Sequence, residues 1–158
     1  MLRFHQEKNA DVTLATIEVP IADASRFGIV SVDDGERVTG FQEKPDQPAA
    51  VPGSPDTALA SMGIYIFRAD VIERALEEDA ARPDSQHDFG KNIIPSLIHT
   101  MPVYSYRFYD EKKKAAKYWR DIGTPDAYFD ASMDICHGNQ EVNRNDPKGR
   151  LRQDRPQG

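Results

Sequence analysis

Runs and alternations of apolar residues in the first half of the chain predict β-strands. The segment "DVTLATIEV" (11–19) is rich in β-branched residues and ends at a proline, which is typical of a buried strand. The segments 27–32 and 37–44 flank the sequence "DDGE", whose Asp-Gly pair favours a hairpin turn. The run "LASMGIYIF" (59–67) is almost continuously apolar, so we expect it to be buried on both faces of the sheet, with helices above and below.

Prolines, glycines and short polar stretches mark the connections between these strands. Residues 21–25 are expected to form a short turn or helical link. Residues 45–58 contain four prolines and one glycine, which predicts an exposed loop with no regular element. We expect the chain to begin directly on the strand 11–19, with no element before it.

Two helices are predicted by capping residues followed by apolar positions. Asp70 is the expected N-cap of the first helix, with Glu73 three residues further on. Asp88 is the expected N-cap of the second helix, in which Pro95 should introduce a kink or shorten the helix. The apolar stripe of the first helix consists of Val71, Ile72, Ala75 and Leu76.

The pattern then returns to strands and ends in a third helix. The segment "VYSYRFY" (103–109) alternates as a half-buried strand does, and "YWRDI" (118–122) is predicted to be a short strand. Thr124 is the expected N-cap of a helix with Pro125 at its first position, and this helix should run to about Ile135.

Composition places the chain among globular proteins of one domain. It has 158 residues, of which 39% are hydrophobic and 29% are charged. Helices mixed with buried strands predict an α/β layered fold over residues 1–135. The residues 136–158 are polar and aperiodic, which predicts a disordered tail.

Charge and apolar content argue against several classes of function. The net charge of −6 argues against a nucleic-acid partner, and the basic run "KKKAAK" (112–117) is interpreted as a solvated loop. No apolar run is long enough to span a bilayer, and no secretory signal is visible after Met1. The single Cys136 excludes an internal disulfide framework, and the four His residues lack metal-ligand spacing. We therefore expect a cytoplasmic protein with no membrane partner.

One short stretch, "GFQEKPDQP" (40–48), joins the end of a predicted strand to a proline-rich turn. Glu43 and Lys44 stand at the join. Taken alone, the stretch allows two interpretations: an ordinary surface ion pair, or two halves of a ligand site at the end of a strand.

Several stretches of the chain together resemble the sugar-1-phosphate nucleotidyltransferases. The resemblance covers residues 11–135 and depends on five stretches in the same order: "ASRFGIVSVDDGERVTGFQEKP", "LASMGIYIF", "HDFGKNIIP", "YWRDIGT" and "AYFDASMDI". The stretches "SMGIY", "HDFG" and "YWRDIGT" are most similar to the branch that adenylylates glucose 1-phosphate. The resemblance implies a partial Rossmann-like nucleotidyltransferase domain, with a mixed, largely buried sheet flanked by helices.

The same resemblance implies roles for five residues in binding glucose 1-phosphate. Lys44 would pair with the phosphate as a compact cation, and Glu43 would accept hydrogen bonds from sugar hydroxyls. Gly28 would let the backbone approach the hexose; the alternative is a strand glycine at a bulge. Ser61 would offer its hydroxyl to the sugar; the alternative is a small buried strand residue. Asp88 would contact the substrate, act as a helix N-cap, or do both.

The resemblance further implies that Asp121 is one of two aspartates that hold Mg²⁺ for the transfer of the adenylyl group of ATP. The alternative is a strand-end carboxylate paired with Arg120 or another neighbour. The products would be ADP-glucose and pyrophosphate, for glycogen or starch synthesis.

Three features of the family are absent from this sequence: the glycine-rich phosphate loop, the second metal-binding aspartate and the C-terminal left-handed β-helix. We therefore expect the chain to be the sugar-binding second half of a catalytic domain, with the ATP site mostly in an N-terminal half, and to be inactive alone. The complete enzyme would be a homo-oligomer. The alternatives are a non-catalytic sugar-phosphate-binding or subunit-interaction fragment, and an enzyme that uses another nucleotide. Unpaired edges on the strands 11–19 and 59–67 should favour self-association.

Overall fold

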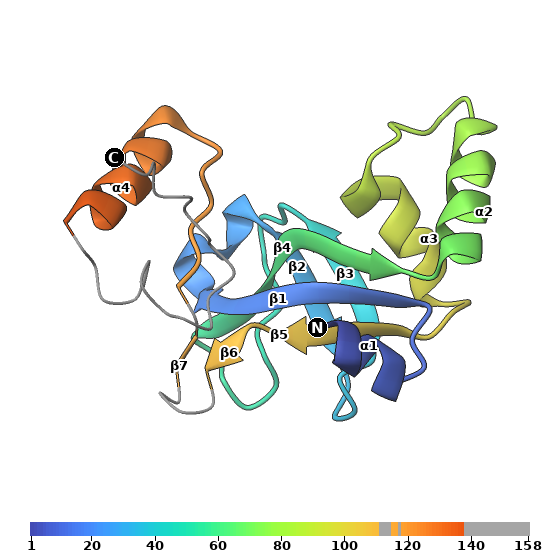
Figure 1. Ribbon diagram of the computed structural model, residues 1–158, viewed down its shortest axis with the longest axis horizontal. Helices are drawn as coiled ribbons and strands as arrows, with labels where there is room; N and C mark the ends of the chain where they lie inside the picture. Colours follow the sequence, from blue (N-terminus) through green and yellow to red (C-terminus); the bar gives the residue numbers. More distant parts are fainter. Residues whose placement is uncertain (111–114, 117, 138–158) are drawn as a thin grey trace, which may run out of the picture. The chain divides into compact units, whose positions relative to one another are not determined.

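The computed structural model describes residues 1–110, 115–116 and 118–137, which belong to two separate units, 1–116 and 117–158. The first unit contains a five-stranded sheet with the order β3-β2-β4-β1-β5 (Figure 1). Its elements are α1 (Leu2–Glu7), β1 (Val12–Pro20), η1 (Ile21–Arg26), β2 (Gly28–Val32), β3 (Val38–Glu43), β4 (Thr57–Phe67), α2 (Ala69–Ala80), η2 (Phe89–Ile93), α3 (Ile94–Ile98), β5 (Val103–Arg107), β6 (Tyr109–Asp110) and β7 (Ala115–Ala116). Because β1 pairs with β5 in parallel and the other neighbours are antiparallel, the sheet is mixed, as predicted for this α/β fold.

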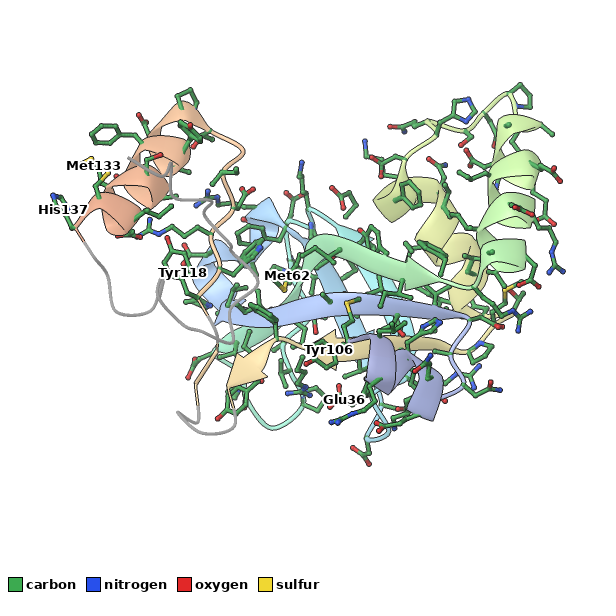
Figure 2. All side chains as sticks on the ribbon, in the orientation of Figure 1. Glu36, Met62, Tyr106, Tyr118, Met133 and His137 are labelled. Carbon is green, nitrogen blue, oxygen red and sulfur yellow. The ribbon has the colours of Figure 1, made fainter. Side chains whose placement is uncertain are left out.

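Helices lie on both faces of the sheet, and side chains from the two sides of β1 are buried. One face packs on α2, η2 and α3, which Figure 1 shows together beside the sheet. On the other face, the His5 ring of α1 hydrogen-bonds to Thr13 at 2.8 Å, and Phe4 makes an edge-to-face contact with Tyr106. Tyr106 is labelled in Figure 2. The core cluster consists of Val12, Leu14, Val30, Val38, Leu59, Val71, Ala75, Ile93, Ile94, Leu97, Ile98 and Val103.

The strand β4 departs from the expectation of a strand buried on both faces. Only Ala58–Ala60 are fully buried, whereas Ile64 is 48% exposed. Leu14 and Thr16 of β1 face Tyr65 and Ser61 of β4, so four residues of β4 advance where β1 advances two. Gly63, at φ +68°, lies inside this bulge and takes a backbone conformation that glycine adopts without steric cost.

The pairing of strands also corrects the prediction of two unpaired edges. The strand β1 is paired on both sides, by β4 and by β5. The strand β4 meets β2 at Ile29 and Ala60, and beyond Ser61 the described residues place no strand on that side. Of the strands β1 and β4, only β4 therefore has an open edge.

Three local expectations about helices change in the structure. The helix α1 precedes the first strand, where no element was expected. The N-cap of α2 is Arg68, and Asp70 instead accepts from its guanidinium at 2.6 Å, because the two opposite charges lie two residues apart. Leu76 is 45% exposed, so only Val71 and Ala75 of the predicted apolar stripe are fully buried.

Other local expectations are confirmed. Residues 21–26 form a short 3₁₀ helix, and β2 and β3 form the antiparallel hairpin. Asp88 caps η2 by accepting from the Lys91 N–H at 2.8 Å. The helix changes from the π-helical turn η2 to the five-residue α3 just before Pro95, which lies in the first turn of α3, so the proline coincides with an irregularity and does not end the helix.

The second unit contains the helix α4 (Pro125–Cys136), which Thr124 caps by accepting from the Ala127 N–H at 3.2 Å. The prediction of a strand over 118–122 is wrong. These residues are irregular, and the side chains of Tyr118 and Arg120 bind α4. Tyr118 donates to Asp134 at 2.9 Å, and Arg120 pairs with the same carboxylate at 2.8 Å. Most of the predicted tail, 138–158, and most of the basic run lie outside the described residues.

The helices of the described ranges are all too short or too polar to cross a membrane.

We predict that a buried leucine and an exposed leucine of the first unit, residues 1–116, differ sharply in their effect on stability. Leu59→Ala should lower the free energy of unfolding by about 2–5 kcal/mol, because Leu59 is 1% exposed and its loss leaves a cavity. Leu76→Ala is the matched control, with an expected change of about 0.5 kcal/mol or less. Urea denaturation of the purified chain measures both values; similar losses would contradict the description of the core.

Candidate functional site

The hairpin of β2 and β3 ends at Glu43 and Lys44, and the Lys44 side chain is much more exposed to solvent than that of Glu43. Gly28 pairs with Glu43, and the Lys44 N–H donates to the Phe27 carbonyl at 3.1 Å, which extends the hairpin by one residue. Lys44 adopts φ +46°, a left-handed conformation that persists in a residue with a Cβ only where its surroundings hold it. The Glu43 side chain is 24% exposed and that of Lys44 is 67% exposed, with 3.8 Å between Oε1 and Nζ. Since exposed ion pairs contribute little, this contact leaves the ammonium available to a ligand.

The Glu43 carboxylate packs against two glycines. A Cβ at Gly90 would lie 2.6 Å from Oε2, and a Cβ at Gly28 would lie 3.0 Å from the same oxygen and 2.6 Å from Phe41 Cζ. A Cβ at Gly28 would displace these two side chains, so the packing of the hairpin itself favours glycine there, whether or not a hexose approaches it. The bulge interpretation of Gly28 is wrong, because the irregular register of this hairpin lies between Ser31 and Val32.

The turn that contains Asp88 packs on β4 through aromatic rings. Asp88 caps η2, so its capping role is confirmed, and its second carboxylate oxygen remains for other contacts. The next residue, Phe89, stacks on Tyr65 with 5.8 Å between ring centroids and 20° between ring planes. The Phe67 ring lies 6.0 Å from Phe89, so three aromatic rings fix this turn against β4.

Two hydroxyl groups of β4 lie beside the carboxylates of Glu43 and Asp88. The oxygens of Ser61 and Tyr65 are 3.4 Å apart. Burial raises the pKa of the Tyr65 phenol, the hydrogen bond with Ser61 acts in the opposite direction, and the negative charges of Glu43 and Asp88 raise the pKa further. Tyr65 therefore stays a neutral hydroxyl in the field of both carboxylates.

The structure thus brings five predicted residues to one end of the sheet. They are Gly28, Glu43, Lys44, Ser61 and Asp88. Tyr65, Phe89 and Gly90 join them and were missed by the sequence analysis, although they stand in the same stretches, "SMGIY" and "HDFG". Two carboxylates, two hydroxyls and an exposed ammonium form a set that suits a ligand with several hydroxyls and one anionic group.

Asp121 belongs to the second unit and is described there by itself. Its Oδ1 accepts from the Gly123 N–H at 3.2 Å. Arg120 turns instead to Asp134, at 2.8 Å, and to Asp130, at 3.9 Å, so the alternative of an Arg120–Asp121 pair does not hold. Within the described ranges, no group of three or more His, Cys, Asp or Glu side chains could hold a metal ion.

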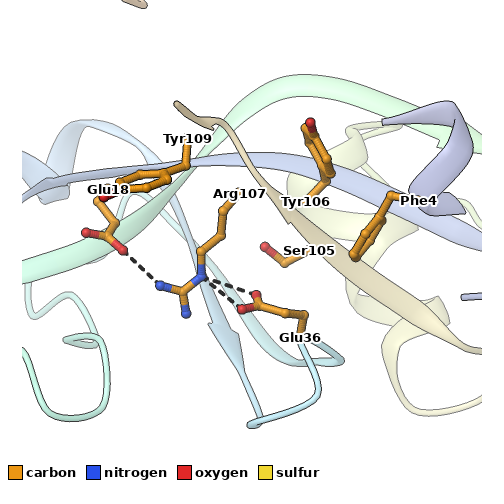
Figure 3. A pocket seen from close by; sticks show the side chains of 7 residues that line it. All are labelled: Phe4, Glu18, Glu36, Ser105, Tyr106, Arg107 and Tyr109. Carbon is orange, nitrogen blue, oxygen red and sulfur yellow. Dashed lines mark hydrogen bonds and ion pairs between the residues drawn. The ribbon is translucent and has the colours of Figure 1, made fainter. Parts of the chain in front are cut away.

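A separate pocket of about 480 Å³ lies at the other end of the hairpin (Figure 3). There Arg107 Nη1 pairs with Glu18 at 2.8 Å, and its Nε pairs with Glu36 at 3.1 Å. These bonds join β5 to β1 and to the turn between β2 and β3, next to the bridge of Arg37 with Tyr104. The charges of this pocket are already paired with one another, and the pocket shares no residue with the cluster around Glu43.

Comparison with known families decides the class of the protein. The sequence profile of the nucleotidyl transferase family matches residues 1–138. The chain belongs to this family. The resemblance drawn from the five sequence stretches is therefore confirmed, together with the α/β fold.

Curated relatives narrow the comparison within the nucleotidyl transferase family. The chain is 50% identical over 137 residues to "Glucose-1-phosphate adenylyltransferase 2" of Vibrio cholerae, a match that covers 85% of this chain and 34% of the relative. It is 43% identical over 157 residues to the glucose-1-phosphate adenylyltransferase of Rhodopirellula baltica, covering 99% and 35%. The corresponding protein of Paramagnetospirillum magneticum is 45% identical over 161 residues, covering 99% and 38%. The chain thus spans about a third of the length of these relatives.

We predict that Gly90→Ala destabilises the first unit, because the new Cβ would displace the Glu43 carboxylate and would crowd Phe41, whose Cε1 would lie 3.2 Å away. Over-packing of this kind costs about 1–3 kcal/mol of unfolding free energy. Gly40→Ala is the matched control, because a Cβ there would lie at an ordinary 3.6 Å from Ser31. Urea denaturation compares the two; if Gly90→Ala were as stable as Gly40→Ala, the close approach of Glu43 to the turn would be wrong.

Proposed function

We propose that this chain supplies the sugar-phosphate site of an enzyme that transfers the adenylyl group of ATP to glucose 1-phosphate. The products are ADP-glucose and pyrophosphate, used for glycogen or starch synthesis. The observation that carries the proposal is the convergence of Glu43, Lys44, Ser61, Tyr65 and Asp88 at one end of the sheet. The names of the relatives support the choice of ATP and glucose, since base selection is not visible in this cluster.

The hydroxyls of the sugar are bound by the carboxylates and hydroxyls of the cluster. Glu43 is held by its packing against Gly28 and Gly90, so its oxygens are oriented before the ligand arrives. Asp88 uses one oxygen to cap η2, which leaves the other to accept from a sugar hydroxyl. Ser61 and Tyr65 can donate or accept, because a neutral hydroxyl does both.

The phosphate of the sugar is bound by Lys44. The cluster without Lys44 carries two negative charges, so a phosphate dianion enters only beside a cation. The Lys44 side chain is 67% exposed, and its ammonium lies 3.8 Å from Glu43 Oε1, so it can reach a phosphate at the open side of the cluster. A phosphate oxygen held in this way attacks the α-phosphorus of ATP, the bond from the α-phosphorus to the β-bridging oxygen breaks, and pyrophosphate leaves.

We further propose Asp121 as one ligand of Mg²⁺. Proteins commonly hold Mg²⁺ by one or two carboxylates together with substrate phosphates, and the exposed carboxylate of Asp121 fits that requirement as a single ligand. When bound, Mg²⁺ neutralises charge that develops on the phosphates.

We predict that Lys44→Ala weakens the binding of glucose 1-phosphate to the purified chain by about 10- to 150-fold, since a charge-assisted hydrogen bond contributes about 1.5–3 kcal/mol. Titration followed by NMR measures the Kd. Lys8→Ala is the matched control, because Lys8 donates to the Gly35 carbonyl at the other end of the hairpin. Equal binding by all three chains would contradict the role of Lys44, and absence of binding by the unsubstituted chain would contradict the site.

We predict a different effect for Asp121→Asn, measured on turnover. The matching segment of the Vibrio cholerae relative is replaced by this chain, and pyrophosphate release is followed with ATP, glucose 1-phosphate and Mg²⁺. Loss of a metal ligand should lower kcat by about 100-fold and leave the KM for glucose 1-phosphate nearly unchanged. Asp126→Asn, in the first turn of α4, is the control. Normal turnover of the Asp121→Asn hybrid at limiting Mg²⁺ would exclude the metal role.

A further inference from the structure

A buried carboxylate at the end of α2 organises a second polar cluster, outside the one described above. Asp79 is 7% exposed and accepts from the Ser85 hydroxyl at 2.6 Å and pairs with His87 Nδ1 at 2.8 Å. The Ser85 hydroxyl in turn accepts from the His87 N–H at 3.0 Å. The serine bonds to the carboxylate and not to the imidazole, so the three groups do not form a nucleophile with its base.

The cluster holds an unfavourable backbone conformation. His87 adopts φ +54°, a region that costs a non-glycine residue free energy and persists only where contacts fix it. Two hydrogen bonds hold the pKa of Asp79 below its usual range: the one from Ser85, which contributes more, and the one from His87. Asp79 is therefore ionised at neutral pH, and both of its hydrogen bonds are charge-assisted.

The residues that follow His87 are those that enter the sugar-phosphate cluster. Asp88 caps η2, Phe89 stacks on Tyr65, and Gly90 lies against Glu43. The backbone conformation at His87 therefore determines the positions of Asp88, Phe89 and Gly90. On its other side the turn is anchored by Asn92, whose Oδ1 accepts from the N–H groups of Gln86 and Asp88 at 3.2 and 3.3 Å.

We propose that Asp79 and His87 are positioning residues for the sugar-phosphate site. The bond between them fixes the left-handed turn at His87 and thereby places Asp88, Phe89 and Gly90 against Glu43 and Tyr65. The consequence for ligand affinity rests on the proposed function, whereas the ordering of the turn does not. The His87 side chain is 61% exposed, so removal of its ring leaves no cavity in the core.

The test compares His87→Ala, His87→Asn and His99→Ala in the purified chain. Asparagine keeps a side-chain N–H donor and tolerates the left-handed region, so it should rescue what alanine loses. His99 is an exposed histidine at the end of α3 and serves as the control. Hydrogen exchange of the Lys91 amide, which is bonded to Asp88, reports the order of the turn.

His87→Ala should accelerate exchange of the Lys91 amide by about 10-fold or more, while amides of β1 stay as in the unsubstituted chain. The Kd for glucose 1-phosphate should rise by a similar factor, and His87→Asn should restore both values. His99→Ala should change neither.

Three results would overturn the proposal. Unchanged exchange in His87→Ala would show that Asn92 alone orders the turn. An equal effect of asparagine and alanine would show that the hydrogen bond is not what matters, and general unfolding of His87→Ala would show a role in stability only. If the unsubstituted chain does not bind glucose 1-phosphate, the proposed function fails, and the exchange data still decide whether His87 orders the turn.

Discussion

The close approach of Glu43 to Gly28 and Gly90 is the contact on which the candidate site depends. One carboxylate oxygen lies where a Cβ at either glycine would stand 3.0 Å or less away. The end of the hairpin and the start of η2 therefore meet backbone to side chain, with no second side chain between them. A Cβ at either position would displace the Glu43 carboxylate from the place where the strand meets the turn that carries Asp88.

This contact joins segments that are far apart in the sequence, which explains what sequence reasoning could find. The hairpin, the Asp88 cap and the Thr124 cap follow from local rules of turn and capping chemistry, and all three are present. The meeting of Glu43 with Gly90 follows from tertiary packing. No local pattern announces it, and so Gly90 was not recognised although its neighbour Asp88 was.

The incorrect expectations have the same origin. Residues 118–122 have the β-forming composition of a strand, but Tyr118 and Arg120 bond to Asp134 on α4. Asp70 has the sequence position of an N-cap, but a nearby guanidinium binds its carboxylate. In both cases a specific charged or hydroxyl partner outweighs a propensity that amounts to a fraction of a kcal/mol per residue.

The bulge in β4 has a geometric consequence for the two hydroxyls of the site. A regular strand rises about 3.4 Å per residue, so residues four apart would be separated by roughly 14 Å along its axis. In β4 the four steps from Ser61 to Tyr65 match two steps of β1, from Thr16 to Leu14, which is about 7 Å. The extra residues are looped out around Gly63 and Ile64, on the exposed side. The strand is thus shortened by half over this stretch, and a single continuous segment delivers two hydroxyl groups to one point.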